Sequence, residues 1–504
     1  MISRRHFVAL LGLWLALTAP LAAETVKVTF ILTNDIYSMG DTAMPDGARR
    51  GGFARLAAVV KAERAKGGHV IFAHGGDTLS PSLMSAIDQG AHIVTLTNMV
   101  PPDIFAPGNH EFDFGKSMFL ARIAEMKFPA YAANLRGPDG RPLPGIKDRG
   151  IVELNGVRIG LTGAAHDDTP HLSSSEDLKF LPAVATMRNE AAALRRDGAD
   201  FVVAVMHADR SQGVELMATG AFDLILTGHS HDLLVSYDGR TAMAESAYDA
   251  HYVTLIDVTI EVALRDGKRN VTWWPQFRVI DTATMTPDPE VAAAVAAFER
   301  RLGQEMDVTI ATTAVELDSR VATVRTQEAA IGNLIADIMN MMMNTDAAVM
   351  NGGGIRGGRV YAPGTAISRR DVLAELPFGN RAVVVEIAGR DLRRALEEGL
   401  AQWPNISGRF PQVSGIALEF DPKRAAGERI VAITVGGAPL DPDKLYRVAT
   451  NDFLARGGDG YAGFRDAKLL TPIDDAQPLL NMVMTYLDRL GTVRTTVENR
   501  IIMK

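Results

Sequence analysis

The chain has 504 residues, of which 47% are hydrophobic and 22% charged, with a formal net charge of −8 and no cysteine. This length and composition predict two or three domains with substantial cores. The negative charge argues against a protein that binds a nucleic acid polymer, which would carry a basic face, and the lack of cysteine excludes disulfides and thiolate chemistry.

The first 23 residues are predicted to be a signal peptide. Arg4-Arg5 and Phe7 precede an apolar stretch, Val8–Leu17, and Leu21-Ala22-Ala23 offers a cleavage site. Paired arginines in this position are typical of a twin-arginine signal, which the twin-arginine export machinery recognises. An ordinary signal and a membrane anchor are the alternatives, although the apolar stretch is short for a span. The sequence therefore predicts a periplasmic or secreted mature protein with no stable membrane span.

The first half of the mature chain alternates short apolar runs with amphipathic helical patterns. This alternation predicts a layered α/β domain over residues 24–286. The expected strands are Val26–Thr33, Val70–Ala73, Arg158–Gly163, Phe201–Met206 and Leu224–Thr227, and the expected helices are Phe53–Glu63 and Val184–Arg196.

An alanine-rich helical segment, Pro287–Gln304, predicts a linker over residues 287–310, before a second α/β domain over residues 311–504. Met341–Met343 is interpreted as core packing, because methionine is a flexible apolar filler. The elements expected in the second domain are helices around Thr326–Met343 and at Arg390–Trp403, and strands at Ala347–Met350, at Ala382–Ile387 and after Gly415.

Polar side chains follow the predicted strands of the first domain. Ligand sites collect at strand ends in α/β sheets, because successive loops converge there. Aspartate, asparagine and histidine are donors that suit Zn, Mn or Co, and one carboxylate can bridge two metals about 3.5–4 Å apart. The pattern predicts a metal site built from Asp35, Asp77, the segment Gly108–Asp113, His207 and the segment Gly228–His231.

These segments resemble a known family. Thr33-Asn34-Asp35, Gly76-Asp77, Gly108–Glu111 and Gly228–His231 are similar to the motifs of calcineurin-like metallophosphoesterases, in the same order. The second half resembles the C-terminal substrate-binding domain of 5′-nucleotidases in the segments Asn351–Arg356, Leu376–Asn380, Phe410–Gly415 and Asn451–Gly460. The resemblance implies a four-layer α/β/β/α metallophosphoesterase domain followed by an α/β 5′-nucleotidase domain.

The resemblance also implies a dimetal hydrolase that acts on nucleotide phosphoesters. Its substrates would be 5′-nucleotides, 2′,3′-cyclic nucleotides, nucleotide sugars or another small phosphate ester, attacked by a metal-bound water. The two divalent ions would be Zn, Mn, Co or Mg, with Asp77 bridging them. The other implied ligands are Asn109, His207 and His229 for one ion, and Asp35 and His231 for the other.

Further roles follow from the same resemblance. His110 and Asp113 would form the catalytic pair, since an imidazole fixed by a carboxylate can donate a proton near neutral pH. Arg356 would bind the phosphate, and Phe410 and Phe453 would stack on the base. Asp459 would bind the ribose and Asn380 would lie near the base. Rotation about the linker would bring the two domains together during turnover.

The sequence departs from the family pattern at Tyr37, where a histidine ligand is expected. A phenol is a poor ligand unless a metal deprotonates it, so the ion next to Asp35 is in question. Two alternative functions therefore stay open. One is a thiosulfohydrolase of sulfur oxidation, which shares the fold, and the other is an inactive homologue that binds a nucleotide or a metal.

Overall fold

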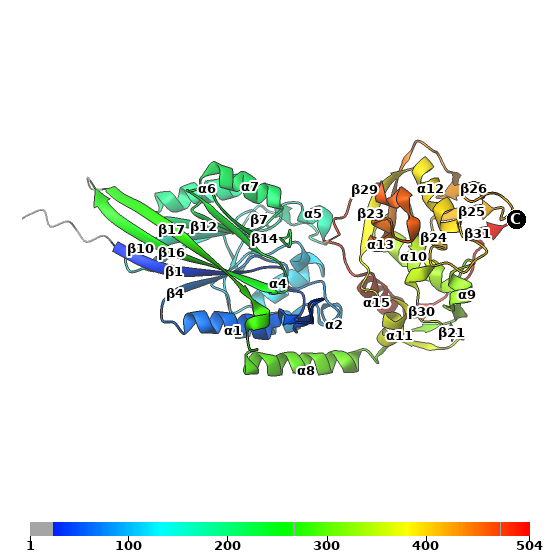
Figure 1. The fold of residues 1–504 in the computed structure, drawn as a ribbon, viewed down its shortest axis with the longest axis horizontal. Helices are drawn as coiled ribbons and strands as arrows, with labels where there is room; N and C mark the ends of the chain where they lie inside the picture. The colour runs from blue at the N-terminus through cyan, green and yellow to red at the C-terminus, as the bar shows by residue number, and fades with distance from the viewer. Residues whose placement is uncertain (1–23, 266–267, 474) are drawn as a thin grey trace, which may run out of the picture.

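The structure, a computed structural model, describes residues 24–265, 268–473 and 475–504. Two domains lie side by side, and helix α8 (Pro289–Glu305) runs beneath the first and leads into the second (Figure 1). The predicted signal peptide lies outside the described residues. Among the described residues, no helix is long and apolar enough to cross a membrane.

The first domain contains two large sheets. Both have parallel central strands, but the seven-stranded sheet is antiparallel at one edge only, whereas the six-stranded sheet is antiparallel at both edges. The seven-stranded sheet has the order β17 (Lys268–Asp281), β16 (Tyr252–Arg265), β1 (Glu24–Thr33), β4 (His69–His74), β5 (Ile104–Phe105), β6 (Ala130–Tyr131), β8 (Ile146–Lys147). The six-stranded sheet has the order β14 (Leu233–Tyr237), β15 (Ala242–Ser246), β13 (Leu224–Gly228), β12 (Phe201–His207), β10 (Val157–Ala164), β9 (Arg149–Leu154).

The two sheets pack face to face, and helices cover both outer faces. Strand β1 shows why: Val28 and Phe30 point into the core between the sheets, whereas Ile31 points to the helical layer. This period-two alternation is what a strand buried on both faces requires. The outer layers contain α1 (Gly52–Arg64), α3 (Ala91–Met99) and α8 on one side, and α6 (Ala183–Arg196) and α7 (Arg210–Thr219) on the other. The predicted four-layer α/β/β/α architecture is confirmed.

A five-stranded sheet forms the centre of the second domain. In β20 (Ala347–Asn351), Ala348 and Met350 pack toward α10 (Ala330–Met342) and α15 (Leu479–Leu490). Ala347 and Val349 pack toward α12 (Gly389–Leu400). The sheet order is β24 (Pro411–Ser414), β20 (Ala347–Asn351), β28 (Leu445–Asn451), β23 (Ala382–Ala388), β29 (Lys468–Leu469). A second sheet of this domain contains β27 (Ala438–Pro439), β26 (Ile430–Val435), β25 (Ile416–Phe420) and β31 (Ile501–Met503).

The predicted strands and helices are all present, with ends that differ by a few residues. The prediction of core packing for Met341–Met343 was wrong in part. Met341 and Met342 are exposed at the end of α10, and only Met343 packs against the core. The helix ends at Met342, and its buried residues end at Met339, so its last turn lies outside the core.

Candidate active site

Six predicted ligands come together at the carboxyl ends of the central strands in the first domain. Asp35 follows β1, Asp77 follows β4, Asn109 precedes the 3₁₀ turn His110–Phe112, His207 ends β12, and His229 and His231 follow β13. Four of them, Asp35, Asp77, His229 and His231, have a left-handed backbone, with φ between 53° and 96°. Such residues are uncommon outside glycine and cluster at functional sites, where the surrounding structure holds them in place.

Two halves of the site meet at Asp77. On one side, His207 Nε2 lies 2.9 Å from Asp77 Oδ2 and 3.2 Å from His229 Nδ1. On the other side, His231 Nε2 lies 3.4 Å from Asp35 Oδ1. Burial opposes the charge of His207, yet Asp77 and Asp35 together raise the pKa of His207 to about 10. A histidine and a carboxylate this close share a proton, and a divalent cation can bind in place of that proton.

The donor set fits divalent cations. Asp77, His207 and His229 present ligand atoms within 4.8 Å of one another, and all three residues are buried. Asn109 Oδ1 is also buried and has no hydrogen-bond partner among the described residues. Buried polar atoms without partners are rare in folded proteins. Nitrogen and oxygen donors of this kind suit Zn, Mn or Co.

Tyr37 takes part in the half of the site that contains Asp35. Its hydroxyl donates to Asp35 Oδ1 at 3.1 Å and lies 3.2 Å from His231 Nε2. Burial, followed by the charges of Asp35 and Asp77, raises the pKa of Tyr37 well above its ordinary value. With no cation bound, Tyr37 is therefore a neutral phenol at pH 7, in the place where a histidine would offer a lone pair.

His110 and Asp113 lie close together as predicted. His110 Nδ1 lies 2.8 Å from Asp113 Oδ2, and Asp113 Oδ1 accepts a hydrogen bond from Ser173 at 2.7 Å. Burial disfavours the charged imidazole, but Asp113 and Asp77 together raise the pKa of His110 to about 10. His110 Nε2 is buried and has no hydrogen-bond partner within the described residues. One nitrogen is thus fixed by a carboxylate, and the other is left available.

Glu111 has a role that sequence reasoning missed, although the residue was part of a quoted motif. Its carboxylate accepts hydrogen bonds from the backbone N–H groups of Asp77, Thr78 and Gly108. It therefore ties the loop after β4 to the loop after β5. Burial, followed by the charge of Asp77, raises the pKa of Glu111 to about 7.

His166 and Asp209 also lie beside the predicted ligands, although neither belongs to one of the motifs quoted above. Asp209 Oδ1 lies 3.5 Å from His229 Nε2, on the side of the ring that faces away from His207. The His166 ring lies 4.3 Å from that of His229. A carboxylate on the outer nitrogen of a ligand histidine fixes the orientation of its ring.

The segments that were expected to bind substrate converge in the second domain. Backbone hydrogen bonds join Gly352 to Phe410 and Gly353 to Gly408, and Asp459 accepts from Asn351 at 2.7 Å. Arg381 and Asp452 bond to each other through their backbones, which places Asn380 next to the segment after β28. The four motifs therefore lie at one end of the central sheet.

The individual side chains in this group differ in exposure. Phe453 is 43% exposed, whereas Phe410 is 2% exposed and belongs to the domain core. Arg356 is exposed and stacks on Phe378, with its guanidinium 5.3 Å from the ring centre. Sequence reasoning missed Arg325. Burial and the charge of Arg356 lower the pKa of Arg325, whose buried Nε has no partner among the described residues.

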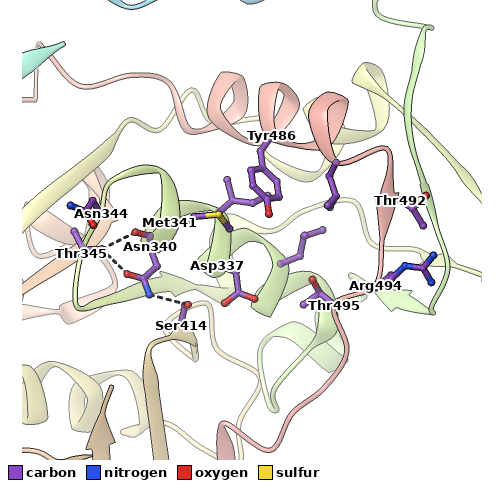
Figure 2. Close-up of a pocket in the computed structure, with 13 residues that line it drawn as sticks. Asp337, Asn340, Met341, Asn344, Thr345, Ser414, Tyr486, Thr492, Arg494 and Thr495 are labelled. Carbon is purple, nitrogen blue, oxygen red and sulfur yellow. Dashed lines mark hydrogen bonds between the residues drawn. The ribbon is translucent and has the colours of Figure 1, made fainter. Parts of the chain in front are cut away.

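A separate groove of about 930 Å³ lies between α10 and α15. Asp337, Asn340 and Tyr486 are among the residues that line it (Figure 2). None of the predicted site residues is among them. The groove is therefore not part of the predicted site.

Two family models match separate parts of the chain. Residues 28–233 match the model of the calcineurin-like phosphoesterase family, and residues 309–466 match that of the 5′-nucleotidase C-terminal domain. The chain is 27% identical to the 5′-nucleotidase of Homo sapiens, over 97% of this chain and 93% of that protein.

Two solved structures share the fold. The NAD nucleotidase of Haemophilus influenzae matches with a TM-score of 0.81 at 20% identity, over 95% of this chain and 99% of that one. The sulfate thiohydrolase SoxB of Thermus thermophilus matches with a TM-score of 0.51 at 19% identity, over 94% of this chain and 96% of that one. At these identities the likeness concerns the fold alone.

Proposed function

Since this chain belongs to the 5′-nucleotidase family and is a hydrolase of phosphoric ester bonds, we propose that it hydrolyses nucleotide phosphoesters with the help of two divalent cations. The observation that carries the proposal is the placement of Asp77 between two groups of donors. His207 and His229 lie on one side, with Asn109 linked to His229 through Asp475. Asp35 and His231 lie on the other side, around a Tyr37 hydroxyl that is 3.5 Å from Asp77 Oδ2. Bound cations would supply Lewis-acid activation of water and of the phosphate.

The residues of the chain divide the work in this proposal. His110 places Nε2 toward the reacting phosphate, where it donates a proton or a hydrogen bond, while Asp113 fixes its tautomer through Nδ1. Arg356 is exposed, and its guanidinium can donate hydrogen bonds to phosphate oxygens. Phe453 offers an aromatic face for the base, and Asp459 accepts from ribose hydroxyls. Phe410 and Asn380 support this base subsite from the neighbouring motifs.

The domain boundaries and the export of the protein are further parts of the proposal. A catalytic domain over residues 24–286 and a substrate domain over residues 311–504 would be joined by the segment 287–310, which includes α8. The Arg4-Arg5 pair and the apolar stretch after it support export by the twin-arginine route. Folded export suits a protein that must acquire its metals before it leaves the cytoplasm.

The substrate is tested by phosphate release from AMP and from an aryl phosphate. Metal-stripped protein is supplied with Mn, Zn, Co or Mg in turn. We expect metal-dependent hydrolysis of AMP with a higher kcat/KM than that of the aryl ester.

Replacing Phe453 with alanine should raise the KM for AMP by about 5- to 150-fold, because base stacking contributes about 1–3 kcal/mol. The KM for the aryl ester should rise less, because its single ring offers a smaller stacking face than a purine. Equal kcat/KM for both esters would reject a nucleotide substrate and leave the cation site standing.

Metal affinity is expected to rise in the variant Tyr37→His. An imidazole at this position offers a neutral lone pair beside Asp35 and His231, whereas the phenol must first lose a proton from a group whose pKa is raised. We expect Zn²⁺ to bind the weaker position about tenfold more tightly or better, which corresponds to about 1.4 kcal/mol. Isothermal titration of metal-stripped protein measures this affinity.

The variant Tyr37→Phe is the matched control for this prediction. It keeps the ring and removes only the hydroxyl. If Tyr37→Phe binds Zn²⁺ as the unaltered protein does, the phenol oxygen is not a ligand. If Tyr37→His binds no more tightly than either, the proposed position of the second cation is wrong.

A further inference from the structure

A loop of the second domain reaches the metal-binding residues of the first. The loop connects β29 to α15 and extends from the second domain toward the end of the first that contains α5 (Thr169–Leu172) (Figure 1). At its tip, Asp475 Oδ1 lies 3.4 Å from Asn109 Nδ2 and 3.4 Å from His229 Nδ1. Asp475 is 366 residues from Asn109 along the chain.

The base of this loop is held firmly on its own domain. Arg381 donates a hydrogen bond to the carbonyl of Ala476 at 2.7 Å, and the N–H of Ala382 donates to the carbonyl of Gln477 at 2.9 Å. Beyond the loop, Asn481 at the start of α15 donates to the carbonyl of Ser82 in the first domain at 2.9 Å. The position of Asp475 is therefore fixed by contacts on both domains.

The buried Asp475 carboxylate has fewer hydrogen-bond partners than its two oxygens can accept. Its side chain is 2% exposed, and its Oδ2 has no hydrogen-bond partner among the described residues. A buried carboxylate oxygen without a partner is costly. Asn109 Oδ1 beside it is buried and unpartnered as well. His229 Nδ1, 3.4 Å from Asp475 Oδ1, lies 3.2 Å from His207 Nε2. A cation bound among these oxygen and nitrogen donors would satisfy both unpartnered oxygens.

From this geometry we propose that Asp475 is a metal ligand contributed by the second domain, which joins Asn109, His207 and His229 around one divalent cation. The proposal rests on the cation site of the proposed function. It makes the cation a link between the domains, because ligands from both hold it at once. The Asp475 carboxylate and a substrate phosphate would compete for the same cation. Binding of metal should then favour the observed domain arrangement, and binding of phosphate should release it.

The affinity test uses full-length mature protein stripped of metal and titrated with Zn²⁺ by calorimetry. We expect the variant Asp475→Asn to bind one of two ions about 10- to 100-fold more weakly than the unaltered protein. The variant Asp488→Asn is the control, because it removes the same charge from an exposed position on α15 and should bind as the unaltered protein does. Unchanged affinity in Asp475→Asn would overturn the proposal. Failure of the unaltered protein to bind Zn²⁺ would overturn the cation site itself, and with it this inference.

The link between domains has its own readout. Since the chain contains no cysteine, Thr95→Cys on α3 and Arg489→Cys on α15 provide a unique pair of sites for spin labels, both exposed. We expect Zn²⁺ to narrow the distribution of distances between the labels, and inorganic phosphate to broaden it again. The same pair in the Asp475→Asn background should not respond to Zn²⁺. A distribution that narrows equally in both backgrounds would show that Asp475 does not couple the cation to the domain arrangement.

Discussion

Replacing His110 with alanine is expected to lower kcat for AMP by about 10²–10⁴-fold, the usual contribution of a positioned proton donor. His110 Nε2 is buried, unpartnered among the described residues and close to the proposed cation site, while Nδ1 is held by Asp113. Steady-state kinetics with the activating metal measures this loss. A kcat within about threefold of the unaltered value would contradict the assigned role.

Metal content separates this catalytic role from a structural one. His110 contacts Asp77 through its backbone, because the N–H of His110 donates to Asp77 Oδ1 at 2.8 Å. Alanine keeps that bond, so the variant should retain the metal affinity of the unaltered protein. The variant Asp113→Ala should show a smaller loss of kcat than His110→Ala, because the imidazole remains although its orientation is no longer fixed.

Locking the two domains together is expected to abolish turnover. Ser82 and Asn481 already meet across the domain boundary, where the side chain of Asn481 donates to the carbonyl of Ser82. The variants Ser82→Cys and Asn481→Cys, combined and crosslinked, would hold the observed arrangement. In this arrangement Asp475 and Arg381 of the second domain face the first domain. Asp459, the predicted ribose-binding residue, accepts a hydrogen bond from Asn351 of its own domain. The proposed rotation about the segment 287–310 would have to break the contact between Asn481 and Ser82 during turnover.

The crosslink experiment carries its own control. Reduction of the crosslink in the same sample should restore turnover, and metal content should be equal in both states. Each single cysteine variant should turn over normally under oxidising conditions. Full activity in the crosslinked protein would rule out domain rotation as a step of the reaction.

Most of the first domain followed from local patterns in the sequence. Apolar runs such as Phe201–His207 are buried along their whole length, and an apolar strand of this kind is recognisable without any tertiary information. Polar residues directly after such strands then had to meet at one edge of the sheets, which is why Asp77 and His207 were predicted together. The roles predicted for them stay predictions.

Other parts of the site depend on contacts that no local pattern records. Asp475 lies in a loop without a motif, and its position is set by hydrogen bonds to a distant segment that includes Arg381. His166 is an isolated histidine in the sequence and gains meaning only from its packing on His229. The burial of Phe410 likewise depends on the core that forms around it. Such features are decided by tertiary packing.

The left-handed backbone of four ligands restricts how this protein can be altered or can diverge. At Asp35, Asp77, His229 and His231, the native side chains already hold a backbone conformation that costs most L-residues about 1–2 kcal/mol each. Glycine and asparagine adopt this conformation more readily. A lineage that loses the activity but keeps the fold should therefore drift toward these two residues at the four positions, whereas at His207, on a regular strand, its choice would be limited only by size and polarity.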